Sequence, residues 1–201
     1  MSRFGFRTRN GQISAIIQGQ SAASTDADAQ AFFDRVTAAG GTLSQTEKDA
    51  VNTLVLSLKA NSLWTLMTSI YPMVGGSAAA CAQNLISSSF TATFSSGWTF
   101  SSTGVTPNGT SAYMNTNLVP NTNLLLDSTH MSLYSRTNQT TIASIVDMGC
   151  EVTSKIYLIT KTGGSTYISV NTNTDTLVST ITDTSGFFAV SRTSSSLTKM
   201  Y

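Results

Sequence analysis

The segment from Lys155 to Val170, KIYLITKTGGSTYISV, decides the fold class. Its centre is the pair Gly163-Gly164, which adopts the positive φ angles of a two-residue hairpin turn without steric cost. Apolar and polar residues alternate on both sides of this pair, as they do in β-strands. Folding the two strands about the turn brings four apolar residues to one face in cross-strand pairs, Ile159 with Ile168 and Tyr157 with Val170. The segment therefore predicts an antiparallel hairpin with one face in a hydrophobic core.

The same period of two extends over the second half of the chain. Of 32 threonines, 24 lie in residues 91–201, and β-branched side chains favour strands. Turn residues such as Pro107-Asn108-Gly109 separate short strands, which we predict at 91–100, 111–118, 130–136, 141–148, 176–182, 186–192 and 197–201. Short strands at this spacing, with no helices between them, predict a mainly β fold: an antiparallel β-sandwich or jelly roll.

Before residue 85 the period is that of helices. One helix is predicted over 26–39, with acidic residues in its first turn and Gly40-Gly41 as its stop. A capping box, Ser44 with Glu47, opens a second helix over 45–60, and a third is predicted over 62–70. The apolar stripes of the first two helices consist of Ala29, Phe32, Phe33 and Val36, and of Val51, Leu54, Val55 and Leu58. Three short helices are too few to bury a stable core alone, so we expect them to pack against another surface.

Residues 1–25 precede the helices and carry five large apolar residues, three arginines and a hairpin-type dipeptide, Asn10-Gly11. Two interpretations stay open: a frayed terminus, or an extended arm that binds a neighbouring subunit. On the second interpretation the partner-binding residues are Arg3, Phe4, Phe6, Arg7, Arg9, Ile13, Ile16 and Ile17. The predicted organisation is an arm (1–25), a small helical module (26–85) and a β-sandwich (86–201). Two interpretations of the last strand of that sandwich stay open: the protein ends naturally at Tyr201, or the sequence is part of a longer chain.

The composition excludes several classes of function. Charged residues make up only 10% of the chain, with 11 basic against 10 acidic groups. A net charge of +1 provides no field that would attract nucleic acid, so no nucleic-acid partner is expected. No apolar run is long enough to cross a membrane, and the first 20 residues lack the core of a signal peptide. A surface rich in Ser and Thr without an export signal is typical of a virion protein, which assembles in the host cytoplasm.

Few side chains can perform catalysis or bind metal. The chain has one histidine, His130, and only two cysteines, and it lacks the CxxC and HExxH spacings of zinc sites. We therefore expect no cofactor and no metal, although Asp127, Asp147 and Glu151 with nearby asparagines leave calcium as a weak alternative. His130 with Asp127 or Asp147 and a serine would make a triad, but no Gly-x-Ser-x-Gly motif supports one. The protein is predicted not to be an enzyme.

The two cysteines, Cys81 and Cys150, lie 69 residues apart. They would form a disulfide only if the fold brought them together. We expect two buried free thiols, because unpaired cysteines are most often core residues.

Three stretches resemble the opening strands of a concanavalin A-like (laminin G-like) jelly roll: Gly97 to Phe100, Gly104 to Tyr113 and His130 to Arg136. Together with the preceding Leu63-Trp64 and Ile70 to Gly76, this order is similar to structural proteins of tailed bacteriophages that carry such a domain after a short helical segment. The resemblance covers roughly residues 50–201. A complete laminin G-like domain has more strands than can be counted in the sequence after these stretches. Its members include glycosidases that need paired carboxylates, but Glu47 and Glu151 are the only glutamates and lie far apart.

The resemblance implies a virion structural protein such as a tail fibre, spike, head fibre or capsid decoration. Its partners would be other virion proteins (capsid, portal or tail), and its oligomers would be homo-oligomers, with trimers common among fibres. It also implies contact with a host-surface glycan, for which Trp98 and Tyr113 are the candidate stacking residues. The alternative for these two aromatics is a place in the core. The predicted function is virion attachment through the arm and helices; the alternative is a carbohydrate-binding module.

Overall fold

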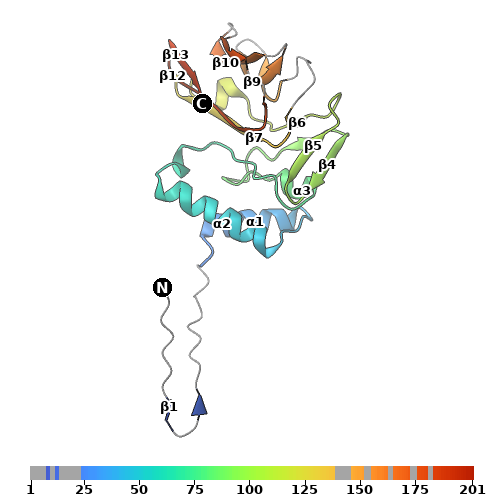
Figure 1. The fold of residues 1–201 in the computed structure, drawn as a ribbon, viewed down its shortest axis with the longest axis vertical. Coiled ribbons are helices and arrows are strands. Elements are labelled where there is room, and N and C mark those ends of the chain that lie inside the picture. The colour runs from blue at the N-terminus through green and yellow to red at the C-terminus, as the bar shows by residue number, and fades with distance from the viewer. Residues whose placement is uncertain are drawn as a thin grey trace.

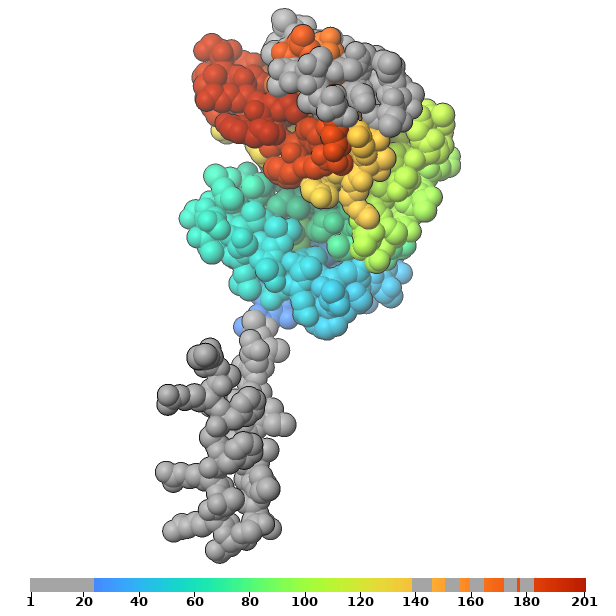
Figure 2. All heavy atoms as spheres, in the orientation of Figure 1, coloured from blue at the N-terminus to red at the C-terminus, as the bar shows by residue number. Residues whose placement is uncertain are grey.

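The computed structural model describes residues 24–138, 146–151, 155–162, 165–172, 176–180 and 183–201, together with the strand pairs 8–9 and 12–13. Between residues 24 and 89 the described structure is helices and loops, and after residue 90 it is mainly strands (Figure 1). We call residues 26–89 the helical unit. In Figure 2 the helical unit, blue to teal, lies directly beside the strand-rich part, green to red.

The first two predicted helices are confirmed. Helix α1 covers Ala27–Ala38, and the Asp26 side chain caps it by accepting from the backbone N–H of Asp28. Helix α2 covers Gln45–Ala60 and begins with the predicted capping box, in which Ser44 and Glu47 exchange hydrogen bonds. A second carboxylate oxygen of Glu47 accepts from the Gly75 N–H at 2.8 Å. The cap of α2 therefore also holds the loop that follows residue 72.

Packing in the helical unit follows the predicted stripes with one exception. The buried cluster combines residues of both helices with the segment after them: Ala29, Phe32, Phe33, Val36, Val51, Val55, Ala80 and Leu85. Leu54 was predicted to belong to this core but is 37% exposed, because α1 contacts α2 along Val51 and Val55. Leu58 is half-buried beside them. The exposed leucine lies on the flank of the buried stripe.

The third helix, predicted over 62–70, is wrong in type and extent. Only the single 3-10 turn η1 (Trp64–Leu66) forms, between a positive φ of 57° at Ser62 and an extended Met67. The polar groups of the next residues bond to Asn84, whose side chain is 1% exposed. Asn84 Oδ1 accepts from the Ile70 N–H at 3.0 Å and from the Ile86 N–H at 3.1 Å. The bond to Ile70 takes the place of a helical one at the end of the predicted helix. The short helix α3 (Ala78–Cys81) precedes Asn84.

Two short pairings begin the strand-rich part. Strand β3 (Thr93–Phe94) pairs with β6 (Met114–Asn115), and β4 (Trp98–Ser101) forms a hairpin with β5 (Gly104–Pro107). The predicted strand 91–100 is therefore two strands, separated at Gly97, which has a φ of +93°. The predicted strand 111–118 shortens to β6. A four-residue helix, α4 (Pro120–Asn123), leads to the larger sheets.

Two antiparallel sheets make up the rest. The four-stranded sheet has the order β11–β10–β9–β8, in which neighbours in space are neighbours in sequence. The three-stranded sheet has the order β13–β12–β7, so β7 pairs with a strand that follows the whole first sheet. The strands are β7 (Thr129–Ser135), β8 (Met148–Glu151), β9 (Lys155–Thr162), β10 (Ser165–Thr172), β11 (Thr176–Thr180), β12 (Gly186–Ser194) and β13 (Leu197–Met200).

The hairpin that decided the fold class forms, but its predicted register is wrong by one residue. Thr162 pairs with Ser165, as symmetric folding about the turn requires. The register then shifts by one residue on β9, between Thr162 and Ile159, and such a shift brings the other set of β9 side chains to the core face. The pairs on the core face are Ile168 with Leu158 and Val170 with Ile156.

The two sheets share one hydrophobic core. Its buried members come from β7, β9, β10 and β12: Met131, Ile156, Leu158, Ile168, Val170, Phe188 and Val190. The described structure is therefore mainly strands in antiparallel sheets with few helices, as the sequence predicted. The jelly-roll arrangement stays a prediction.

Other predictions fall on residues outside the described ranges. These include most of the strand 141–148 and the turn Gly163-Gly164. Of the arm, the structure describes only the backbone of β1 (Thr8–Arg9) and β2 (Gln12–Ile13), which pair antiparallel on either side of Asn10-Gly11. No helix among the described residues is long and apolar enough to cross a membrane.

Candidate functional site: the outer face of the three-stranded sheet

The three-stranded sheet has two faces of different character. Side chains alternate along a strand, so Met131, Phe188 and Val190 point into the shared core while their neighbours point away from it. We call the opposite side the outer sheet face. Its residues are His130, Ser132 and Tyr134 of β7, Phe187, Ala189 and Ser191 of β12, Lys199 of β13, and Tyr201.

Three aromatic side chains stand on the outer sheet face. Phe187 lies directly opposite Tyr134 in the β12–β7 register, and the side chains are 63% and 70% exposed. Tyr201, also 70% exposed, pairs with Ala189 through two backbone hydrogen bonds beyond the end of β13. Ala189 is only 5% exposed although it lies on this face. Ala189 is thus a small, buried residue on this face, near the exposed Phe187–Tyr134 pair and Tyr201.

A polar row lies next to the aromatic residues. His130 and Ser191 face each other across β7 and β12, and His130 Nδ1 lies 3.0 Å from Ser191 Oγ. Lys199 is the partner of Ser191 on the other side. Partial burial lowers the pKa of His130 below its ordinary value, so the imidazole is neutral at pH 7. The row thus offers a neutral imidazole, a hydroxyl and an ammonium group beside a set of exposed rings.

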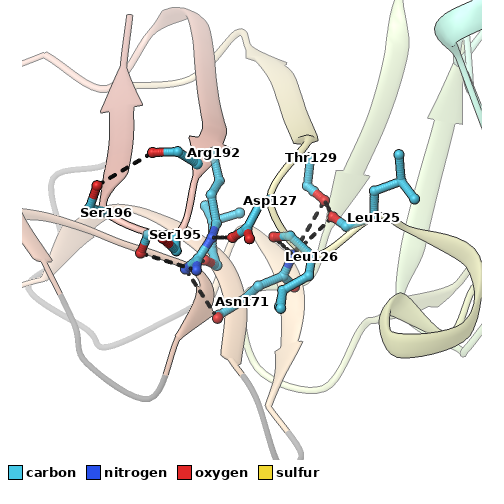
Figure 3. A network of polar contacts seen from close by, with 10 residues as sticks. Leu125, Leu126, Asp127, Thr129, Asn171, Arg192, Ser195 and Ser196 are labelled. Carbon is cyan, nitrogen blue, oxygen red and sulfur yellow. Dashed lines mark hydrogen bonds and ion pairs between the residues drawn. The ribbon is translucent and has the colours of Figure 1, made fainter.

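A charged residue on the reverse side holds the sheet in place (Figure 3). Arg192 of β12 is 8% exposed and points toward the core. Its Nε donates to Asp127 at 2.9 Å, and Nη1 donates to the carbonyl oxygens of Val170 and Asn171 at 3.0 and 3.2 Å. Nη2 donates to the Ser195 carbonyl at 3.2 Å. One guanidinium therefore joins both sheets, the loop before β7 and the turn after β12.

Asn171 extends this network to the same loop. Its Nδ2 donates to the Leu126 carbonyl at 2.9 Å and lies 3.3 Å from the hydroxyl of Thr129, which is itself bonded to the Leu125 carbonyl. Asn171 has a φ of +52°, a conformation that asparagine adopts more readily than most residues. The network fixes the start of β7, and with it the position of His130.

The predicted glycan residues Trp98 and Tyr113 lie together, but away from the outer sheet face. The Trp98 ring packs edge-to-face on Phe94 at 5.3 Å, and its indole N–H donates to the Tyr113 carbonyl at 3.1 Å. These contacts tie Trp98 to the β3–β6 and β4–β5 hairpins. The Tyr113 side chain is 66% exposed. Trp98 is half-buried, so Tyr113 is the more exposed of the two.

Of the triad considered from the sequence, the structure places His130 beside Ser191 but does not bring Asp127 to it. The imidazole faces Ser191, but Asp127 bonds to Arg192 on the reverse side of the sheet. Cys81 and Cys150 are unpaired, the first buried and the second half-buried. Burial raises the pKa of both thiols, which keeps them protonated at pH 7. No three His, Cys, Asp or Glu side chains gather as a metal site in the described part of the chain.

The predicted arm contacts are largely beyond what the structure describes. For Arg9 and Ile13 only the backbone is described, and Arg3, Phe4, Phe6, Arg7, Ile16 and Ile17 lie outside the described residues.

The outer sheet face was not identified from the sequence. Its aromatic residues come from positions 134, 187 and 201, and nothing local to any of them shows that they share a face. A partial signal was present in residues 186–192, where apolar residues occupy successive positions in GFFAVSR instead of alternating. Such a strand is apolar on both faces, which indicates a surface beyond the core.

Comparison with protein-family models, with curated proteins and with solved structures found no match.

Proposed function

We propose that this protein is a non-enzymatic structural component of a bacteriophage virion. The arm and helical unit attach it to capsid, portal or tail proteins, and the strand-rich part projects outward as a fibre, spike or head decoration. The observation that carries the proposal is the division of the chain into a capped helical unit and a separate two-sheet core whose outer face is aromatic and exposed. An attachment end and a contact end are the two parts that such a component needs.

The sheets support the finer fold proposed with this function, a concanavalin-like β-sandwich. Two sheets of four and three strands share one core, and β7 pairs with β12 across the intervening β8–β11 meander. Pairing between strands far apart in sequence is characteristic of sandwiches and jelly rolls. The same proposal includes homo-oligomerisation, because a protein attached at a symmetric position of a virion is present in several symmetry-related copies.

Deletion of residues 1–23 tests the attachment. We expect phage particles that carry the deletion to lose this protein while the deleted protein still folds, because the helical unit begins at the Asp26 cap. The measurement is quantitative mass spectrometry of purified particles, with circular dichroism of the deleted protein as the folding control. Full occupancy of particles by the deleted protein would contradict the proposal.

The outer sheet face favours a second candidate function, carbohydrate binding. Sugar rings stack on exposed aromatic faces, and their hydroxyls take up hydrogen bonds from adjacent polar groups. Phe187, Tyr134 and Tyr201 supply the rings around the Ala189 floor. The neighbouring His130–Ser191 pair supplies hydrogen-bonding groups. The site would be on a rigid sheet, held from behind by Arg192.

Replacing Tyr201 with alanine tests this second function. We expect binding to a polysaccharide identified on a bacterial glycan array to weaken about fivefold, since a stacked ring is worth roughly 1 kcal/mol. Tyr113→Ala is the matched control, because Tyr113 is nearly as exposed but lies elsewhere. Equal effects of the two substitutions, or an array without hits at high valency, would reject carbohydrate binding at the outer sheet face.

A further inference from the structure

We propose that the outer sheet face binds an acidic polysaccharide whose carboxylate is attached directly to the sugar ring, as in a hexuronic acid. This inference rests on the second candidate function, carbohydrate binding, and specifies its substrate class. The exposed ammonium of Lys199 selects the acidic sugar, and the exposed rings of Tyr201, Phe187 and Tyr134 hold the polysaccharide. A neutral polysaccharide is the alternative occupant.

The strand register arranges the outer sheet face in three rows. Residues directly opposite each other share a face, and the next residue on that face follows two positions along the strand, about 6.8 Å away. In order along the sheet, the rows are His130–Ser191–Lys199, Ser132–Ala189–Tyr201 and Tyr134–Phe187. The polar and charged groups therefore lie at one end of the face and the paired aromatic rings at the other end.

Lys199 carries the only charge on the outer sheet face at pH 7. Its side chain is exposed and forms no ion pair or hydrogen bond with any residue that the structure describes. The His130 imidazole in the same row is neutral, because partial burial lowers its pKa. An unpaired cation on a face without carboxylates is complementary to a ligand that brings one negative charge.

The described carboxylates next to these strands do not neutralise Lys199. Asp127, in the loop before β7, accepts from Arg192 Nε at 2.9 Å on the reverse side of the sheet. Asp183 precedes β12 and so lies beyond the aromatic end of the face, away from Lys199. Its Oδ1 accepts from the backbone N–H and the hydroxyl of Ser185 at 2.8 and 2.7 Å. The ammonium group thus stays available to an anion from solution.

The His130–Ser191 pair supplies a hydrogen-bond donor in the same row as the ammonium. A neutral imidazole has one N–H and a serine one O–H, and the 3.0 Å contact between Nδ1 and Oγ uses one of these two hydrogens. If the imidazole donates, the hydroxyl is free to donate to a ligand. If the hydroxyl donates, the imidazole Nε2–H is free. Either tautomer therefore leaves one donor that can bond to a carboxylate oxygen close to Lys199.

The short distance between the charge and the rings favours a sugar acid. Tyr201, which is 70% exposed, follows Lys199 by two positions and stands in the adjacent row, about 6.8 Å along the strand. The carboxyl carbon of a hexuronic acid is bonded to the sugar ring. A ring stacked on Tyr201 therefore brings its carboxylate toward Lys199, whose flexible stem spans the remaining distance. A phosphodiester-linked polymer carries its charge outside the ring, farther from a stacked sugar. The Tyr134–Phe187 row, one interval further on, is placed for the next sugar of the chain.

Pairs of matched oligosaccharides test the selection by charge. Oligomers of galacturonate, glucuronate and alginate are each compared with the same oligomer after reduction of its carboxyl groups to alcohols, by isothermal titration calorimetry of the full chain. We expect at least one acidic oligomer to bind about fivefold more tightly than its reduced form at about 50 mM salt, as for an exposed ion pair. The preference should shrink at about 0.5 M salt, which screens the charges. Equal affinity for both forms, or no binding of any acidic oligomer, would overturn the inference.

Substitutions locate the selecting charge. Lys199→Gln should lower the affinity for the acidic oligomer to that for the reduced one. Lys48→Gln is the matched control, because it removes the same charge from helix α2 and should preserve the preference. Since Lys199 is exposed, the unfolding curve of its variant should superpose on that of the unchanged chain. A preference for the acidic form that survives Lys199→Gln, or that Lys48→Gln removes equally, would contradict the role of Lys199.

Two results distinguish failure of the charge selection from failure of carbohydrate binding itself. Tyr201→Ala should weaken the acidic and the reduced oligomer alike, about fivefold, because stacking does not depend on the carboxylate. If both forms bind equally and Tyr201→Ala still weakens them, the charge selection is wrong and carbohydrate binding stands. If Tyr201→Ala has no more effect than Tyr113→Ala, carbohydrate binding at the outer sheet face fails together with the inference. Attachment to the virion is decided separately, by the deletion of residues 1–23.

Discussion

Replacing Arg192 with methionine is expected to lower the free energy of unfolding by about 2–4 kcal/mol, because it removes one charged partner from a largely buried network. Methionine approximates the length of the side chain but donates no hydrogen bond. The carbonyl oxygens of Val170, Asn171 and Ser195 would lose their donors. The Asp127 carboxylate is 44% exposed and can be solvated, which keeps the estimate below that for a fully buried ion pair.

The matched control is Arg136→Met. Arg136 is exposed and also donates to a carbonyl, that of Thr103, so the substitution changes the same chemistry where water can replace it. Its expected effect is within about 0.5 kcal/mol. Urea unfolding followed by tryptophan fluorescence and circular dichroism measures both. Because Arg192 joins the two sheets, Arg192→Lys should recover only part of the loss: a lysine ammonium cannot reach partners in four directions. Equal stability of the Arg192 and Arg136 variants would show that the network does not hold the sheets together.

The parts of the fold that the sequence predicted correctly are those fixed by local interactions. The capping box of Ser44 and Glu47 involves residues three positions apart, so both partners stand in one short stretch of sequence. The buried stripe of α1 follows from a period that the sequence displays directly. The antiparallel character of β9 and β10 follows from alternation about a glycine pair.

The errors arise where residues distant in sequence compete with local preference. The helix predicted over 62–70 ends after one turn, and the Ile70 N–H, which a longer helix would bond within itself, donates to Asn84, 14 residues away. The register of β9 and β10 differs because an extra residue on β9, between Thr162 and Ile159, and not the turn, sets most of the pairs. The outer sheet face needed the pairing of Tyr134 with Phe187, which are separated by an entire sheet. Arg192 gave no sign of burial, since a charged residue is normally expected outside.

Replacing Asn84 with alanine is expected to lower the free energy of unfolding by about 3–5 kcal/mol, as several polar groups lose their partner at once. The side chain is 1% exposed and accepts from the Ile70 and Ile86 N–H groups. Its Nδ2 donates to the Ser89 carbonyl at 3.1 Å. An alanine methyl fills little of the space and satisfies none of these groups. Thermal and urea unfolding of the variant measure the loss.

Asn108→Ala is the control that distinguishes the effect of burial on stability from the effect of the number of hydrogen bonds lost. Asn108 Oδ1 accepts from three backbone N–H groups, those of Thr110, Ser111 and Ala112, at 3.0 to 3.1 Å, but the residue is exposed. Water can replace the lost acceptor there, so we expect a cost of about 1 kcal/mol or less. If burial determines the cost, Asn84→Ala must exceed Asn108→Ala severalfold although both remove an asparagine that binds several backbone groups. Similar losses would mean that Asn84 does not direct the chain out of the helix after residue 66, and that the short turn at Trp64–Leu66 ends for another reason.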